Sequence, residues 1–565
     1  MTSSSASGGW GGGVRASRAR AGTTTAPDYT GQARHSARRT LTTLTERSSR
    51  RRWLTALAWL LIAAALFVCY LHISRTEPAN SDGAANALQA WDMLHGNLLL
   101  HNWWLSDVSF YTTELPEYML VELVRGLNAD VVHVAAALTY TLLVLLAAIL
   151  AKGRATGREA VVRMLLAGGI MVAPQLGTAA GILLLSPDHV GTNVPVLLIW
   201  LLLDRAPRRW WVPVLAGVLM TWALIGDGIV MYTGFLPLTI VCAIRAYRAV
   251  VVRREPGTEH RYELGLILAA LVAAELSTRL LVLVHSIGGF LVWPVSPLLA
   301  VSSQMPRHLA YTAHGLVVLF GADFFGGKVS FVVLLILLHL VGLALAGWAV
   351  CAGVRRFFTG NDLVDQILVA GVLIGLTVYV LGKRVSDINS TREFAEVLPF
   401  AAVLAGRLLA PRLMRARLVP ALAVVLAGYL VSLGQAAAAA PVPPMNQQLA
   451  DWLAGHGLRY GMSTYWQSSI VSLATGEHVM VVPVATATKT QGSLVRRDEW
   501  ESTEDWYDPR LHYANFIVQL ATPNGLPAFL PLASVQHTFG KPAQVYLVGP
   551  YRILVWHRNL LPELG

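Results

Sequence analysis

The first candidate site of this chain is an acidic loop that lies between its first two long hydrophobic segments, from about Ser74 to Asp130. This loop holds eight carboxylates and only two arginines. A carboxylate can take the proton of an attacking hydroxyl group, and a nearby cation can stabilise a departing phosphate. Three of the acids are therefore candidate catalytic residues for transfer from a phosphate-linked substrate, namely Asp82, Asp107 and Glu114.

Asp82 precedes a segment, residues 84–98, whose apolar residues recur at helical spacing. Polar residues lie opposite them, which suits a short helix in the membrane interface. N-capping of that helix is the competing interpretation of Asp82. For Asp107 and Glu114 the competing interpretation is a solvated or substrate-orienting group. The loop also offers two candidate substrate-binding residues, His101 and Tyr111.

A basic cluster lies in a second connection, GKRVSDINSTREF, and provides three candidate substrate-binding residues, Lys383, Arg384 and Arg392. Ser390 and Glu393 have the spacing of a capping box, so the next helix is predicted to begin there. A cation at a helix N-terminus opposes the helix dipole, so Arg392 needs a partner. That partner is either Glu396, four residues further on, or a lipid phosphate, which suits the forked donors of arginine.

Two further turns carry polar residues to the same predicted side of the membrane. SPDHVGTN contains His189, and GDG contains Asp227. Helix capping and turn chemistry explain each residue taken alone. Because both turns share a side with the acidic loop, a substrate-binding role stays open for His189 and Asp227.

The elements that position these residues are predicted from hydrophobic runs. The chain is 55% hydrophobic and 14% charged, whereas soluble domains contain about 25% charged residues. About eleven runs approach membrane-spanning length. They lie near residues 53–73, 131–151, 163–185, 190–204, 210–226, 228–246, 263–285, 329–353, 363–382, 394–410 and 418–438. The sequence therefore predicts a mainly α polytopic membrane protein with about eleven transmembrane helices.

Alternate connections between these runs differ strongly in charge. Five connections together hold 18 Lys and Arg residues, whereas the opposite connections hold seven. By the positive-inside rule, the more basic connections face the cytoplasm. We therefore expect a multi-pass plasma-membrane protein with a cytoplasmic N-terminus, and with the acidic loop and the C-terminal region outside the cell.

Composition divides the chain into three predicted parts. Residues 1–50 are rich in Ser, Thr, Gly and Arg, which indicates a disordered basic cytoplasmic tail. Residues 51–438 form the multi-span region, with the external acidic loop at 74–130. After PVPP, residues 439–565 contain one helical segment, NQQLADWLAGHG, and strand-like segments such as GEHVMVVPVATA and YRILVWH. We expect a small extracytoplasmic α/β domain there.

Charge and cysteine usage exclude several functions. The net charge of +11 arises mainly from ten arginines in residues 1–52, which serve as a topology signal and an anionic-lipid contact rather than a nucleic-acid site. The three cysteines lie in hydrophobic runs, so no disulfide framework or cysteine zinc site is expected. No metal-binding residues and no cofactor are predicted, although a divalent metal stays open. Lysine provides only 5 of 44 basic residues, which is typical of a GC-rich genome such as an actinobacterial one.

The acidic loop resembles that of a known superfamily. An acid soon after the first span, an amphipathic helix, a Trp/Asp stretch and the segment YTTELP look like the first external loop of GT-C glycosyltransferases. The likeness is greatest to the aminoarabinose transferase and protein O-mannosyltransferase type. It implies a multi-span body, an external α/β domain and an acidic catalytic base, which by position is Asp82. The sequence departs from this pattern at Gly83, where many relatives have a second acid.

The leading hypothesis is therefore a membrane glycosyltransferase that acts at the outer face. Its expected partners are the lipid bilayer, a polyprenyl-phosphate sugar donor and a cell-envelope glycan or protein acceptor, with no nucleic acid. A transporter or flippase is the first alternative, and a non-catalytic envelope-assembly protein is the second. Transporters place polar groups near the membrane midplane, but here only Glu275 and Arg279 lie deep in a hydrophobic run, and their spacing predicts a self-neutralising pair.

Overall fold

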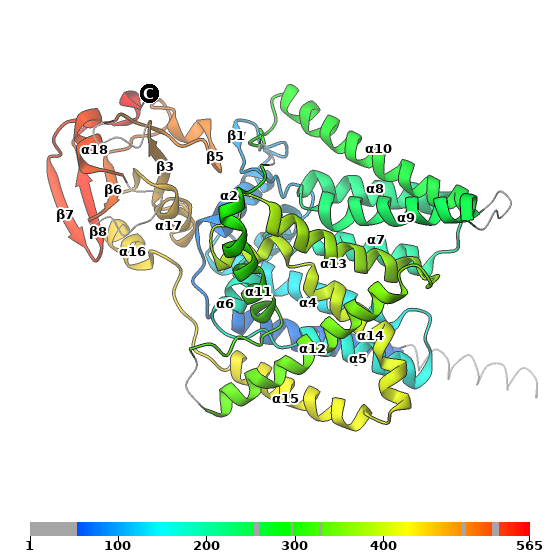
Figure 1. The fold of residues 1–565 in the computed structure, drawn as a ribbon. Coiled ribbons are helices and arrows are strands. Elements are labelled where there is room, and N and C mark those ends of the chain that lie inside the picture. The colour runs from blue at the N-terminus through cyan, green and yellow to red at the C-terminus, as the bar shows by residue number, and fades with distance from the viewer. Residues whose placement is uncertain are drawn as a thin grey trace, which may run out of the picture. The chain divides into compact units, whose positions relative to one another are not determined.

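The computed structural model describes residues 53–252, 259–294, 298–326, 330–487, 493–521 and 530–564. The predicted basic tail, residues 1–50, lies outside these ranges. The chain divides into two units, Met1–Ile62 and Ala63–Gly565, and all contacts described below lie within the second. In Figure 1 the helices come first along the chain, and a sheet follows towards the C-terminus.

The predicted class, a mainly α polytopic membrane protein, is confirmed. Among the described residues, eight helical runs are long and apolar enough to cross a membrane. They are the first helix (Trp53–Ser74), α4 (Asp130–Lys152), the run Met231–Val251 that comprises η1 (Met231–Phe235), α9 (Leu236–Tyr247) and most of η2 (Arg248–Val252), α10 (Glu259–Ser286), α12 (Phe331–Arg356), α13 (Leu363–Leu381), α14 (Val397–Arg415) and α15 (Val419–Ala437). The predicted number of eleven spans is not confirmed.

Several predicted spans are shorter helices. These are α5 (Gly157–Met171), α6 (Thr178–Leu183), α7 (Asn193–Arg205) and α8 (Trp211–Gly226). The run 163–185 breaks between α5 and α6, where two buried hydroxyl groups replace helical donors. Tyr140 donates to the Met171 carbonyl at 2.8 Å, and Tyr70 donates to the Val172 carbonyl at 2.9 Å. These bonds satisfy carbonyl groups that the end of a helix leaves free.

The acidic loop folds into two helices, α2 (Ser81–Leu94) and α3 (Leu115–Arg125). The N-cap of α2 is Asn80, whose side chain accepts from the Gly83 N–H, so the capping interpretation of Asp82 is wrong. The predicted division into an apolar and a solvated polar face is also wrong. Asn86 and Gln89 are buried with the apolar residues, because α2 is enclosed by α3, α4 and the C-terminal region.

The segment 286–328, which follows α10, contains a helix that the sequence did not suggest. α11 (Met305–Leu319) begins with a proline in its first turn, where the missing N–H does no harm. It packs against α13 and against η4 (Ile388–Phe394), and Gly315 allows a close approach to Thr391. Part of this Pro-interrupted, apolar segment is therefore regular helix.

The C-terminal region forms a six-stranded sheet of order β4-β3-β2-β6-β8-β7. Its strands are β2 (Tyr460–Ser463), β3 (Met480–Thr486), β4 (Val495–Arg497), β6 (Phe516–Leu520), β7 (Gln544–Val548) and β8 (Tyr551–Val555), and its helices are α16 (Gln447–Gly455), α17 (Ser469–Ala474) and α18 (Leu532–Phe539). β2 pairs in parallel with β3 and β6. The sequence did not predict β2, because RYGMS lacks the β-branched alternation of a strand.

Two contacts tie this region to the acidic loop. β1 (Trp103–Trp104) pairs antiparallel with β5 (Ser502–Thr503). The short 3-10 helix η5 (Tyr465–Gln467) leads into α17, which packs against α2. Residues of the C-terminal region are thereby placed next to Asp82.

Candidate active site

Asp82 lies in the first turn of α2 and meets a cation from a distant part of the chain. One carboxylate oxygen of Asp82 is 3.5 Å from Nη1 of Arg392, which belongs to η4 between α13 and α14. The other oxygen accepts a hydrogen bond of 2.9 Å from the Tyr465 hydroxyl. The Asp82 side chain keeps 20% of its surface exposed, so it is still accessible to a substrate.

The structure tests one of the two partners that the sequence suggests for Arg392. Arg392 contacts Asp82, so the predicted pair with Glu396 is wrong. Glu396 is instead buried against Gly375 of α13, where a side chain would collide with its carboxyl group. The predicted Ser390–Glu393 capping box is also replaced: Asp387 caps η4, and the Ser390 hydroxyl accepts from the Asp387 N–H.

A second cation of the same connection reaches another acid of the loop. Arg384 forms an ion pair with Asp107. The Glu393 carboxyl is close enough to both residues for their charges to affect it. Burial raises the pKa of Glu393, and the positive charges of His189, Arg384 and Arg392 oppose that shift. The connection between α13 and α14 therefore brings two arginines to two predicted catalytic acids.

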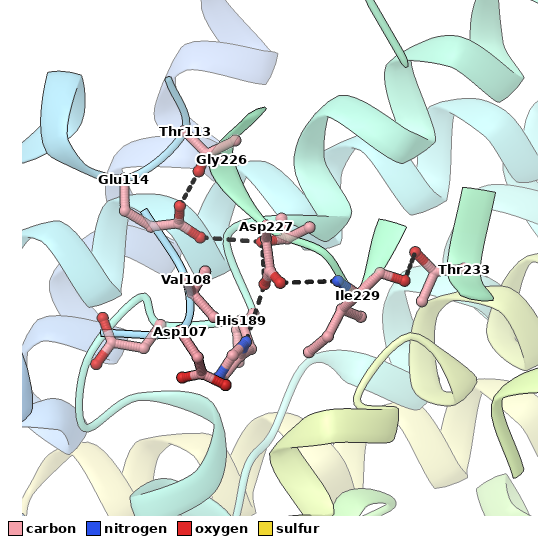
Figure 2. A network of polar contacts seen from close by, with 12 residues as sticks. Asp107, Val108, Thr113, Glu114, His189, Gly226, Asp227, Ile229 and Thr233 are labelled. Atoms are coloured by element: carbon pink, nitrogen blue, oxygen red, sulfur yellow. Dashed lines mark hydrogen bonds and ion pairs between the residues drawn. The ribbon is translucent and has the colours of Figure 1, made fainter. Parts of the chain in front are cut away.

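Figure 2 shows a buried network around Asp227, at the end of α8. Asp227 accepts from His189 Nδ1 at 2.9 Å, from the Thr192 hydroxyl at 2.9 Å and from the Ile229 N–H at 2.8 Å. The Thr192 hydroxyl also lies 3.2 Å from Glu114, which accepts from Thr113 as well. His189 has a left-handed backbone, φ 60°, which turns its ring towards Asp227.

The pKa values of the two acids in this network are shifted in opposite directions. Burial raises the pKa of Glu114 well above its ordinary value, and the charges of Asp227 and Asp188 add to the shift. Burial would also raise the pKa of Asp227, but His189 and the hydrogen bonds outweigh it and lower that pKa. Burial would lower the pKa of His189, but Asp227 outweighs it and raises that pKa. These directions favour an ion pair of His189 and Asp227 and the protonated form of Glu114.

Asp188, next to His189, links this network to α2. Its carboxylate accepts from Asn86 at 2.9 Å and from Ser186 at 2.7 Å. Burial and the charge of Asp82 raise the pKa of Asp188. Asn86 of α2 therefore holds a carboxylate close to the candidate base.

Three predicted site residues lie apart from these contacts. His101 is exposed and hydrogen-bonds the Gly288 carbonyl through Nδ1. Tyr111 donates to the Leu98 carbonyl at 2.8 Å, and its ring packs against Phe290. Lys383 has an exposed side chain, and its backbone N–H donates to Leu298.

The structure also adds residues that the sequence did not single out. Tyr465 contacts both Asp82 and Glu501, and Thr192 bridges Glu114 and Asp227. In the sequence, Glu501 is only one of several acids among aromatic residues, and no local pattern marks Tyr465 as a site residue. Within the described ranges, no group of three or more His, Cys, Asp or Glu side chains is arranged to hold a metal ion.

Comparison with solved structures identifies proteins of similar fold. No family model matches the sequence, and no curated protein matches it. The structure is similar to ArnT from Cupriavidus metallidurans bound to undecaprenyl phosphate, with a TM-score of 0.52 and 12% identity over 88% of this chain and 97% of that chain. The apo state of the same protein gives a TM-score of 0.52 and 12% identity over 91% and 99% of the two chains. The predicted likeness to the aminoarabinose transferase type is therefore confirmed at the level of the fold, and the comparisons say nothing of the organism of origin.

Proposed function

We propose that this chain, which has the fold of ArnT, is an integral-membrane glycosyltransferase that takes its sugar from a polyprenyl-phosphate donor. The lipid-linked donor is suggested by the undecaprenyl phosphate bound to that structural neighbour. The acceptor is a hydroxyl-bearing glycan or protein of the cell envelope. The charge asymmetry of the connections supports a site at the outer face of the membrane.

The observation that carries this proposal is the meeting of Asp82 and Arg392. A base and a cation from distant parts of the chain lie 3.5 Å apart, as transfer from a phosphate-linked sugar requires. Asp82 has partial exposure, so it can reach a substrate hydroxyl. Arg392 has five N–H donors, so it can face Asp82 and a phosphate oxygen together.

The proposed reaction is a single displacement at the anomeric carbon of the donor. The acceptor oxygen forms a bond to that carbon while the bond from the carbon to the phosphate oxygen breaks. The acceptor proton passes to Asp82, and the electron pair leaves on the polyprenyl phosphate. Arg392 stabilises the negative charge that develops on this leaving group.

The direct test is sugar transfer by the purified protein with a labelled polyprenyl-phosphate sugar. Wild type should release free polyprenyl phosphate, either by transfer or by slow hydrolysis. Asp82→Asn should reduce this release by about 10²- to 10⁴-fold, because general base catalysis contributes that much. Donor binding without release by wild type would indicate a carrier and would contradict the proposal.

Arg392 is tested by donor affinity. Arg392→Ala should weaken donor binding about 10- to 100-fold, because hydrogen bonds to charged groups are stronger than neutral ones. The matched control is Arg279→Ala, because Arg279 lies on an exposed face of α10 and pairs only within its helix, with Glu275 at 2.7 Å. Equal affinity of the two variants would remove Arg392 from the donor site.

A further inference from the structure

Two side chains of the C-terminal region lie against Asp82, and the proposed reaction does not yet use them. The Tyr465 hydroxyl is 2.9 Å from Oδ1 of Asp82, and it also contacts Oε2 of Glu501. Tyr465 is 7% exposed and Glu501 is 4% exposed. A hydrogen-bonded series of three side chains, Glu501, Tyr465 and Asp82, therefore connects the C-terminal region to the candidate base.

The number of protons in this series follows from the geometry. A phenol carries one hydrogen, so Tyr465 can donate to only one of the two carboxyl groups. The second contact requires a proton on a carboxyl group. Asp82 is partly exposed and faces the Arg392 guanidinium, whereas Glu501 is enclosed. Glu501 therefore holds the proton and donates to Tyr465, while Tyr465 donates to Asp82.

The electrostatics of the enclosed groups agree with this order. Burial raises the pKa of Glu501 well above its ordinary value, and the nearby charge of Asp82 raises it further. Burial also raises the pKa of Tyr465 well above its ordinary value. Both shifts favour the protonated form of the group.

Local structure holds both groups in place. Glu501 has a left-handed backbone with φ 50°, which is unfavourable for a residue with a β carbon. It immediately precedes β5, which pairs with β1 of the acidic loop. Tyr465 stands in η5 beside α17, whose Ile470 and Leu473 belong to the same buried cluster as the alanines of α2. Contacts between the acidic loop and the C-terminal region thus hold Glu501 and Tyr465 in hydrogen-bonding position towards Asp82.

We propose that Tyr465 and Glu501 are positioning residues that hold the Asp82 side chain correctly oriented for the transfer step. This inference rests on the proposed function. It assigns the C-terminal region a direct part in the site, since the hydrogen bond to Asp82 forms only when that region is docked on the loop. No covalent step passes through either residue.

The main test compares two buried tyrosines of the C-terminal region. Tyr465→Phe removes only the hydroxyl that reaches Asp82. It should lower kcat for sugar transfer about tenfold or more, because a hydrogen bond to a charged group is lost, while KM for the donor stays the same. The matched control is Tyr507→Phe, because its buried hydroxyl donates to the Pro483 carbonyl at 2.6 Å, lies 3.2 Å from the Asp498 carbonyl oxygen, and does not contact Asp82. This control should keep the wild-type kcat.

Glu501 is tested with a conservative and a non-conservative variant. Glu501→Gln keeps a neutral donor towards Tyr465 and should retain most of kcat. Glu501→Leu fills a similar volume without a donor and should lower kcat as Tyr465→Phe does. Thermal unfolding of every variant shows whether it is folded. An equal decrease in kcat for Glu501→Gln and Glu501→Leu would overturn the inference. So would an equal decrease in kcat for Tyr465→Phe and Tyr507→Phe.

One readout needs no substrate. The infrared difference spectrum between wild type and Glu501→Gln should contain the carbonyl stretch of a protonated carboxylic acid at neutral pH. Carboxylate bands in its place would overturn the inference. If wild type transfers no sugar but the protonated band is present, the proposed function fails while the hydrogen-bonded series stands.

Discussion

At the scale of residues, the site holds more carboxyl groups than cations, and shared hydroxyl groups make this arrangement possible. Glu501 and Asp82 share the Tyr465 hydroxyl, and Glu114 and Asp227 share the Thr192 hydroxyl. Glu501 is more enclosed than Asp82, whereas Glu114 and Asp227 are equally buried and His189 favours the ionised form of Asp227. The sequence shows the acids, but only the contacts show which of them carry charge.

The His189–Asp227 pair predicts a particular dependence of stability on pH. The raised pKa of His189 contributes stability that is complete below its unfolded value, about 6.5, and is lost as pH rises through the folded value. The lowered pKa of Asp227 contributes stability that is present above about pH 3.9 and is lost as pH falls through its folded value. The ion pair is therefore most stabilising between these limits.

The test is His189→Gln, which keeps a neutral donor towards Asp227 but removes the charge. Its apparent Tm should lie below that of wild type by the largest margin between about pH 4 and 6.5, and the margin should close at alkaline pH. The matched control is His101→Gln, because His101 is exposed and hydrogen-bonds a backbone carbonyl. A difference in Tm between wild type and His189→Gln that is constant over the whole pH range would rule out the ion pair.

At the scale of elements, α2 packs closely against α4 at Gly83. Gly83 is buried, and an added Cβ would lie 2.6 Å from a side-chain methyl of Val132 in α4. A larger side chain would therefore require Val132 or its helix to move. Asp82, the residue before it, keeps its place in the first turn of α2.

Gly83→Ala should therefore destabilise the protein by about 1 to 3 kcal/mol, as overpacking of a core commonly does. The matched control is Gly168→Ala in α5, because a Cβ there would meet its nearest neighbour, Ala148, at an ordinary 3.7 Å. That variant should be neutral or slightly stabilising, since alanine favours helices over glycine. Thermal unfolding in detergent measures both, and equal Tm values would show that α2 and α4 are not closely packed.

At the scale of the whole molecule, the distribution of basic residues predicts which ends of the helices share a side. The acidic loop, the connection between α13 and α14 and the C-terminal region meet at the site. The more basic connections belong to the opposite ends of the helices. We therefore expect the site and the C-terminal region to face outwards.

Cysteine labelling of intact cells tests this orientation. After the three native cysteines are replaced, Ala454→Cys in α16 should react with a membrane-impermeant maleimide. Thr359→Cys, in the exposed connection between α12 and α13, should react only after the cells are lysed. Both positions are exposed, so access depends on the side of the membrane. The reverse pattern would place the site in the cytoplasm.

The sequence by itself determined the features that depend on neighbouring residues. Hydrophobic runs and alternating charge predicted a polytopic helical protein, and the acidic loop and the basic connection were both identified as candidate site segments. Periodicity also predicted four of the six strands in the large C-terminal sheet. These signals are local, because helix and strand periods are set over a few residues.

Only the tertiary structure decided which of these groups meet. The contact of Asp82 with Arg392, and its hydrogen bond with Tyr465, 383 residues further along, depend on how α2 is enclosed by other helices and by the C-terminal region. Periodicity says which face of a helix is apolar but not which partner covers it. For that reason the sequence predicted a polar side of α2 at the membrane interface, whereas in the fold Asn86 and Gln89 are buried and Asn86 donates to Asp188.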